Sequence, residues 1–575
     1  MPFRQKRDLR THWLASVLWL LAATSASAVA DADVVILGSD AEVADTLQGY
    51  LDNALADCAD KQEIEADRVA FAAREALDAL GLFDGRVDIL TGDTACDVTL
   101  TVQAGEREKV VAWTTVLEPA NALATETAAQ LAALTATGGE FIPADYESAK
   151  RRVLNTLREA GYLDAALQHA EVQIAPGTGA TIHWLLQPGR RYRVSDLRID
   201  QAILDPALFQ RYLTLEPGAP LETSRLRESR ENLVSSDYFT QVELTPLLQE
   251  RDGDSLPVQI TTTPAPPWSL LAGAGYSTDT GPRARLTASA PYLNRQGHSL
   301  HTGLLASPVT GEFTTNYRWP DGDPTHEWFE LTAGANYEYT DSADSVARTL
   351  GLRRTSRPHS DWTRTTYTQL LDERFDVADQ NGHATLLLFG VNYSYSSTID
   401  AARPMSGRSF SVDLRGAHES LLSDSTLVQM QIQAKQIIKL PADMRLIARF
   451  EGGVTWEDAF DDLPPSLRFF TGGDGSVRGY GLDTIGTADL QGNVIGGSRL
   501  LVASVEWDVP VRAQWSAALF YDTGSAYDTS VEFNSSVGLG LRWYSPLGPI
   551  RLDLAHPLDD SGQAVRLHLS LGPDL

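Results

Sequence analysis

Cysteine is nearly absent from this chain, since Cys58 and Cys96 are the only two among 575 residues. A framework of several disulfides is therefore excluded, and with no paired histidines we expect no zinc or other metal site. In an oxidising compartment the two thiols would form one disulfide, which stabilises a domain by about 3–4 kcal/mol on the chain-entropy model. Two buried free thiols are the alternative, and the sequence leaves both open.

Basic residues are also scarce, with 47 Lys and Arg against 76 Asp and Glu, for a net charge of −29. Recognition of nucleic acid needs a basic footprint that neutralises phosphates. A nucleic-acid partner is therefore excluded. The hydrophobic fraction of 43% still predicts a chain that buries a core, and 575 residues are enough for several domains.

Long apolar runs are missing except near the N-terminus. Residues 13–23 form an apolar stretch interrupted only by Ser16, and Ala26-Ser27-Ala28 offers a cleavage site of small residues. With a basic segment in front, this pattern is typical of a secretory signal peptide, predicted over residues 1–28; a retained anchor is the alternative. No later run approaches the ~18–20 apolar residues that a transmembrane helix needs. The basic residues in front are Arg4, Lys6, Arg7 and Arg10.

Three segments in the first half of the chain share one pattern: a helix with an apolar face, a turn that carries an aromatic residue, and a strand. Gly81 and Gly161 fall where a helix C-cap takes a positive φ. The period of about 75–80 residues suits independent α+β domains and is too long for a solenoid repeat. Chance similarity of short helix–turn–strand segments is the alternative. The three turns are Gly81-Leu82-Phe83, Gly161-Tyr162-Leu163 and Asp237-Tyr238-Phe239.

The pattern changes at residues 264–267, Pro-Ala-Pro-Pro, which we interpret as a linker because proline continues neither a helix nor a sheet ladder. Beyond it, apolar and polar residues alternate, as in the segment 505–509, Val-Glu-Trp-Asp-Val. Apolar residues toward lipid and polar residues toward a wet lumen are typical of a membrane barrel, whereas a soluble sandwich would reverse the faces. With a signal peptide in front, about 310 residues of such character predict an all-β transmembrane barrel of about sixteen antiparallel strands.

The most specific block in the chain is residues 469–480, Phe-Phe-Thr-Gly-Gly-Asp-Gly-Ser-Val-Arg-Gly-Tyr. It lies in a connection from about residue 461 to 497, and connections of that length are usually functional or disordered. Arg478, beside Gly479, could reach carboxylates inside the barrel lumen. A solvated extracellular loop is the alternative, although two adjacent aromatic residues and an embedded arginine would be unusual there.

A second string, residues 520–524, reads Phe-Tyr-Asp-Thr-Gly. At a period of two, Phe520 and Asp522 share a face opposite Tyr521. If Tyr521 faces lipid, Asp522 faces the lumen and is available to pair with Arg478, with Glu506 on the same side. A merely hydrated carboxylate is the alternative.

No signature of an enzyme is convincing in this sequence. Asp522-Thr523-Gly524 and Asp279-Thr280-Gly281 match the active-site string of aspartic proteases, but that chemistry needs two carboxylates that share a proton. One triplet precedes Pro282 in an expected turn, and the other lies on an expected barrel strand. The GxSxG, HExxH and P-loop motifs are absent. We therefore expect that the protein is not an enzyme and that it binds no cofactor.

The three blocks at residues 469–480, 520–524 and 538–553 together resemble the signature of the BamA superfamily. The segments 275–279 and 571–575, and an arm of three units rather than five, resemble its TamA branch. The resemblance covers essentially the whole chain after the signal peptide and is strongest in the C-terminal half. One departure from generic outer-membrane proteins is the terminal Leu575, where an aromatic residue is usual.

The resemblance implies three periplasmic POTRA domains, at residues 31–107, 108–189 and 190–264, followed by a barrel in the outer membrane at 266–575. It implies that the long loop folds into the lumen and is held there by Arg478. It also implies a weak seam between the first and last strands, and glycine and proline weaken a ladder there. The residues of the lumenal lock are Arg478, Gly479, Tyr480, Asp522, Glu506 and Phe520, and those of the seam are Gly273, Gly275, Gly572 and Pro573.

By the same resemblance, the expected function is insertion of autotransporter-type β-barrel proteins into the outer membrane through the seam. The expected partners are unfolded outer-membrane proteins, outer-membrane lipid and a TamB-like protein anchored in the inner membrane, which reaches the first POTRA domain. A conduit for phospholipid between the two membranes is the main alternative. A two-partner secretion pore would carry two rather than three POTRA units, and a passive porin would need no periplasmic arm.

Overall fold

A computed structural model describes the chain from Val34 to Leu571 with short gaps. The chain divides into two compact units. The first comprises residues 1–193 and 220–223, and the second comprises residues 194–219 and 224–575. No helix in the described part is long and apolar enough to cross a membrane. The predicted signal peptide, both cysteines and the seam residues Gly572 and Pro573 lie outside the described residues. The described residues are 34–37, 41–55, 66–91, 98–120, 123–135, 137–359, 361–378, 380–397, 403–545, 548–559 and 565–571.

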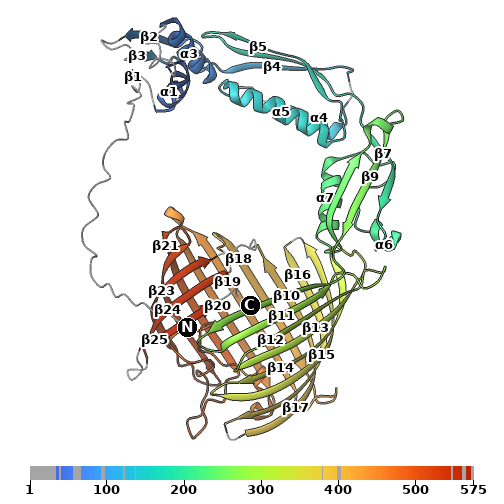
Figure 1. The fold of residues 1–575 in the computed structure, drawn as a ribbon, viewed down its shortest axis with the longest axis vertical. Coiled ribbons are helices and arrows are strands. Elements are labelled where there is room, and N and C mark those ends of the chain that lie inside the picture. The colour runs from blue at the N-terminus through green and yellow to red at the C-terminus, as the bar shows by residue number, and fades with distance from the viewer. Residues whose placement is uncertain are drawn as a thin grey trace, which may run out of the picture. The chain divides into compact units, whose positions relative to one another are not determined.

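The first unit contains two α+β domains, and the described residues of each form two helices and a three-stranded sheet (Figure 1). In each sheet the last strand of the domain lies in the middle, parallel to the first strand and antiparallel to the second. The first domain comprises β1 (Val34–Leu37), α1 (Ala41–Leu55), α3 (Ala66–Ala79), β2 (Arg86–Thr91) and β3 (Val98–Gln103). The second comprises β4 (Val110–Leu117), α4 (Thr125–Leu134), α5 (Pro143–Glu159), β5 (Ala166–Ala175) and β6 (Gly179–Gln187).

The repeated pattern of the sequence corresponds to the second helix of each domain and the strand after it. Pro143 occupies the first turn of α5, where its missing N–H costs no hydrogen bond. Gly81 and Gly161 have φ of 81° and 97°, as the C-cap prediction requires. Asp237 takes the equivalent place in the third repeat with φ of 64°. Each domain also has an earlier helix, which the repeat pattern did not reveal.

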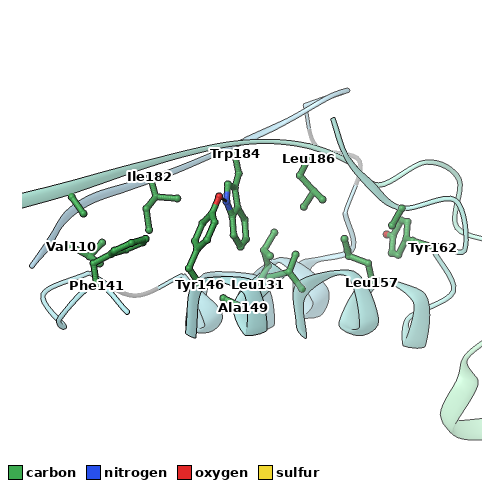
Figure 2. Close-up of a cluster of buried hydrophobic side chains, with 13 residues drawn as sticks. Val110, Leu131, Phe141, Tyr146, Ala149, Leu157, Tyr162, Ile182, Trp184 and Leu186 are labelled. Atoms are coloured by element: carbon green, nitrogen blue, oxygen red, sulfur yellow. Dashed lines mark hydrogen bonds between the residues drawn. The ribbon is translucent and has the colours of Figure 1, made fainter. Parts of the chain in front are cut away.

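The core of the second domain lies between α5 and the sheet (Figure 2). Tyr146, Val153 and Leu157 recur at helical spacing and are buried, and Tyr146 and Leu157 point toward the sheet. Trp184 on β6 faces them, and its Nε1 donates a hydrogen bond to the Tyr146 hydroxyl at 3.2 Å. The face of α5 that burial requires is therefore the one that the 3.6-residue period of the sequence predicts.

The second unit contains a third α+β domain and a closed barrel (Figure 1). The third domain repeats the strand order of the first two, with its last strand in the middle of the sheet. Its last strand reaches Pro264, so the first proline of the predicted linker still belongs to the sheet, and the barrel begins after residue 268. The domain comprises β7 (Arg193–Asp200), α6 (Pro206–Gln210), α7 (Thr223–Val234), β8 (Phe239–Pro246) and β9 (Ser255–Pro264).

The barrel has sixteen strands, each paired antiparallel with its neighbours in the chain, as predicted. The first strand, β10, also pairs with the last, β25, which closes the ring. The strands are β10 (Ser269–Ser277), β11 (Gly281–Ala290), β12 (Ser299–Ala306), β13 (Thr310–Pro320), β14 (Glu327–Tyr339), β15 (Ala343–His359), β16 (Trp362–Val377), β17 (Gln380–Ser396), β18 (Gly407–Ala417), β19 (Leu427–Lys439), β20 (Arg445–Glu457), β21 (Arg499–Arg512), β22 (Trp515–Tyr527), β23 (Asn534–Ser545), β24 (Gly548–Pro557) and β25 (Arg566–Leu571).

Alternation along the strands separates an apolar outer face from a polar lumen. On β21, Val505 and Trp507 are exposed, whereas Asp508, the residue after Trp507, is fully buried. On β22, Tyr521 is exposed and Asp522 is buried. Exposed apolar and buried charged residues in one strand are the reverse of a soluble sheet and suit a wall between lipid and lumen.

Candidate functional site

The connection between β20 and β21, residues 458–498, folds into the barrel and is called the lumenal loop below. Its middle carries buried apolar residues, including Phe469, Val477 and Tyr480, which a solvated loop would not bury. Backbone hydrogen bonds within the loop join Phe469 to Gly497 and Thr471 to Ile485. The loop is therefore an ordered plug whose residues face the inner surface of the barrel.

Arg478 of the lumenal loop is bound to Asp522 on β22 in a two-point geometry. Its Nε lies 2.7 Å from one carboxylate oxygen and its Nη2 lies 2.9 Å from the other. The Arg478 backbone N–H also donates to Asp522, and Ser504 donates to it at 2.6 Å. Paired hydrogen bonds of this kind fix direction as well as distance. The two residues that the sequence predicts as partners thus lie together.

The remaining Nη1 of Arg478 reaches two further carboxylates. It lies 2.7 Å from Glu506 on β21 and 3.2 Å from Asp553 on β24. Arg542 on β23 bridges the same two carboxylates, with its Nη2 at 3.1 Å from each. We call these five residues the lumenal charge cluster: Arg478, Arg542, Asp522, Glu506 and Asp553.

Asp553 and Arg542 are members of the cluster that the sequence analysis missed. Both alternate with outward residues in the run 538–553, so their lumenal direction was readable from the period of two. The pairing between individual lumenal charges could not be predicted, because Asp553 and Arg478 are 75 residues apart in the sequence. The period predicts a face, whereas the partners depend on how the loop enters the barrel.

Aromatic and glycine residues shape the space around Arg478. Its guanidinium lies over the Phe520 ring, 3.4 Å from the ring centre, which adds a cation–π contact. A Cβ on Gly538 would lie 2.2 Å from that ring, so the strand beside Phe520 has room only for glycine. Gly479 has φ of 98°, and Tyr480 donates to the Ser535 carbonyl at 3.3 Å. All six predicted lock residues therefore lie in one region of the lumen.

The carboxylates of the charge cluster favour the charged form of Arg478. Burial by itself lowers the pKa of the Arg478 guanidinium, but Asp522, Glu506 and Asp553 outweigh burial and raise that pKa. Arg478 and Asp522 are almost fully buried, so removal of either partner would leave a charge without water. The cluster suits mechanical positioning of the loop, and its carboxylates are all occupied by arginines.

The junction between β10 and β25, called the seam below, is the shortest pairing in the part of the barrel that the structure describes. Among the described residues, β10 pairs with β25 only through Tyr276 with Leu571 and Ser277 with Ser570. The other neighbour of β10, strand β11, pairs with all of Ser269–Ser277. Most of β10 therefore lacks a described partner on the β25 side.

Gly275 and Gly273 of the predicted seam differ in their surroundings. A Cβ on Gly275 would lie 2.6 Å from the Leu571 carbonyl oxygen, whereas one on Gly273 would meet nothing within 4 Å. Gly275→Ala should therefore push β25 away from β10 at a cost of about 1–3 kcal/mol, and Gly273→Ala should not. Amide hydrogen exchange of residues 566–571 would measure this. Equal exchange in the two variants would show that the close approach does not hold the seam.

Three groups near the seam come close enough together to raise the question of a metal. The ligand atoms of Asp279, Asp474 and His568 lie within 4.8 Å of one another. Both ring nitrogens of His568 are engaged, because Nε2 accepts a hydrogen bond from the Gly479 N–H at 2.8 Å and Nδ1 contacts Asp474. The histidine offers no lone pair to a cation in this arrangement, so the group is an internal hydrogen-bond network.

The two carboxylates of this network differ in their tendency to ionise. Burial raises the pKa of Asp474, but hydrogen bonds from His568 and Ser277 outweigh it and lower that pKa below the ordinary value. Burial and the nearby Asp474 charge raise the pKa of Asp279. Asp474 is therefore the carboxylate of the network that ionises more readily.

A closed barrel of sixteen antiparallel strands, with an apolar outer face and a loop bound inside by buried charges, defines an outer-membrane β-barrel protein. The Omp85 superfamily domain matches residues 273–574, slightly more than half of the chain. The chain belongs to the Omp85 superfamily. The predicted localisation, an outer-membrane barrel with N-terminal domains in the periplasm, is confirmed.

Similar proteins include the outer membrane protein assembly factor BamA of Nitratidesulfovibrio vulgaris, which is 27% identical over 374 residues, 61% of this chain and 46% of that protein. BamA of Neisseria meningitidis is 23% identical over 71% of this chain and 59% of that protein. The chain thus spans about half the length of these relatives. In fold it is similar to BamA from Haemophilus ducreyi lacking POTRA domains 1–3, with a TM-score of 0.66, 15% identity, and coverage of 81% of this chain and 99% of that one.

Proposed function

We propose that the protein inserts β-barrel proteins into the outer membrane, and that a client strand pairs with β10 when the seam opens. The observation that carries the proposal is the short seam, in which β10 pairs with β25 at only two described positions. A backbone edge is costly in hydrocarbon, so an edge with few partners to lose can exchange them for a client strand at a low barrier. Main-chain hydrogen bonds recognise a client without reading its sequence. Named assembly factors among the relatives agree with this class of function.

Two finer assignments belong to the same proposal. The three α+β domains act as POTRA domains, since each has two helices against a sheet of the same strand order. The assignment to the TamA type rests on the three N-terminal α+β domains and on segments such as 275–279. It makes autotransporter-type proteins the clients and a TamB-like inner-membrane protein the partner of the first domain.

A disulfide across the seam tests the opening directly. Tyr276→Cys with Leu571→Cys places two cysteines at register partners, where Cα atoms of antiparallel strands lie within reach of a disulfide. Oxidation should abolish insertion of an autotransporter barrel domain into proteoliposomes, and reduction should restore it. The matched control, Leu331→Cys with Leu352→Cys, bridges β14 and β15 and should leave insertion unchanged. Full insertion with the seam bridged would refute the proposal.

Phospholipid transport is the outcome that a second experiment separates from insertion. The protein is depleted in its native cell, and outer-membrane β-proteins and the phospholipids of both membranes are quantified over time. Selective loss of autotransporter-type proteins with unchanged lipids is expected. Lipid imbalance that appears first, with those proteins still assembled, would favour a lipid conduit.

A further inference from the structure

We infer that Asp474 of the lumenal loop is a positioning residue that joins the two edge strands of the seam. Its carboxylate accepts a hydrogen bond from the Ser277 hydroxyl on β10 at 2.7 Å. The same carboxylate contacts Nδ1 of His568 on β25. One side chain of the loop therefore binds the first and the last strand of the barrel at once. The inference rests on the proposed function in so far as opening of the seam is its functional step.

The protonation of His568 follows from its two neighbours. The Gly479 N–H donates to Nε2 at 2.8 Å, so Nε2 carries no proton. The proton of the neutral ring then lies on Nδ1, which donates it to the Asp474 carboxylate. Both contacts of His568 come from the lumenal loop, from positions on either side of Arg478. The loop thus holds the imidazole of β25 between Asp474 and Gly479.

The contacts on the β10 side are equally direct. Besides Ser277, the Thr278 hydroxyl donates to Asp474 at 3.4 Å, and the Asp474 N–H donates to the Asp279 carboxylate. Thr278 also bonds β25 itself, since its N–H donates to the Leu569 carbonyl at 3.0 Å. The end of β10 and the turn after it are therefore tied to the loop and to β25 in the same place.

These side-chain contacts matter because the described backbone ladder of the seam comprises only two register pairs. Hydrogen bonds to a charged group contribute more to stability than neutral ones, and Asp474 is the carboxylate of the network that ionises more readily. The seam cannot part between Ser277 and His568 unless Asp474 releases one strand. Because a coupling free energy is reciprocal, withdrawal of the loop from the lumen should also loosen the seam. Asp474 and Arg478 are four positions apart, so the charge cluster and the seam are linked through one short segment.

Amide hydrogen exchange of the full-length protein in nanodiscs, without any client, tests the inference. Asp474→Ala should raise exchange of residues 269–277 and 566–571 by about tenfold to a hundredfold, the loss expected for hydrogen bonds to a charged group. Exchange of β14 and β15 should stay unchanged. The matched control is Asp489→Ala, because the Asp489 carboxylate accepts hydrogen bonds only within the loop, from Gln491 and Asn493.

A second variant guards against a folding defect in the first. Ser277→Ala removes the shorter of the two hydroxyl contacts on the β10 side while the loop keeps its own sequence, and it should raise exchange of residues 566–571 in the same direction. The double variant should add little to Asp474→Ala, since both remove one interaction. The inference would be overturned if Asp474→Ala gave the same seam exchange as Asp489→Ala, or if the effects of Asp474→Ala and Ser277→Ala were additive. It would also be overturned if β14 exchanged as fast as the seam in Asp474→Ala. Because no client is present, these results stand even if insertion is not the function.

Discussion

Replacement of Arg478 by alanine is expected to release the lumenal loop from the barrel wall and to destabilise the folded protein by about 3–5 kcal/mol. Arg478 and Asp522 are 4% and 0% exposed, so the variant leaves Asp522 buried without its two-point partner and with only the more distant Arg449, whose Nη2 lies 3.9 Å from Oδ1. Arg542 still binds Glu506 and Asp553, but it makes no contact with Asp522 that would replace the loss. Proteolysis of the loop in intact nanodiscs measures its release, and the thermal midpoint of barrel unfolding measures the loss of stability.

Insertion of clients should fail in the Arg478→Ala variant for a reason separate from stability. The loop carries both Arg478 and Asp474, and a displaced loop no longer holds the edge strands in register. Arg478→Lys keeps the charge but lacks the planar guanidinium that binds Asp522 at two points. This variant should therefore lose less stability than Arg478→Ala, while its loop should still be displaced from the barrel wall.

The double variant Arg478→Ala with Asp522→Asn separates the two effects. Removal of both charges should recover much of the lost stability, because no ionised carboxylate is left buried at that point. The loop should remain protease-sensitive and insertion should remain defective. Normal loop protection and normal insertion in Arg478→Ala alone would show that the cluster does not hold the loop.

Strand periodicity accounts for the parts of the site that the sequence predicts. A period of two assigns Asp522 and Glu506 to the lumen because the residues just before them, Tyr521 and Val505, are apolar. The glycine-rich block around Arg478 in a long connection then supplies the opposite charge. The contact of Arg478 with Asp522 follows from a short list of lumenal charges, and the structure places the two together.

Contacts that depend on loop placement could not be predicted in this way. Asp474 meets His568 across 94 residues and Ser277 across 197 residues of chain. No local period relates these positions, and only the closure of the barrel brings β10 and β25 to one place. The first helices of the second and third domains were missed for a different reason: α4 is uniform in apolar character and α6 has only five residues, so neither has a strong apolar face. In the first domain, α1 does have an apolar face, with Val43, Leu47 and Leu51 buried at helical spacing.

Replacement of Trp184 by alanine is expected to destabilise the second α+β domain by about 3–5 kcal/mol, the usual cost of an aromatic residue removed from a packed core. Trp184 is 1% exposed at the centre of the sheet. Its ring meets that of Trp113 edge-on at 5.0 Å between centres, and its N–H donates to Tyr146. The variant therefore opens a cavity between α5 and the sheet and leaves the Tyr146 hydroxyl without its donor (Figure 2).

Hydrogen exchange in the full-length protein should show this loss in α5 and β6 and not in the barrel, because the barrel belongs to a separate compact unit. The first domain should loosen at Phe83, whose ring lies 6.0 Å from that of Phe141 in the same core. Val116→Ala on β4 is the matched control, since that side chain is exposed on the same sheet. If the arm recruits a periplasmic partner while the barrel inserts clients, Trp184→Ala should weaken partner binding and leave the seam intact. Loss of seam protection in this variant would instead show that the arm and the barrel unfold as one.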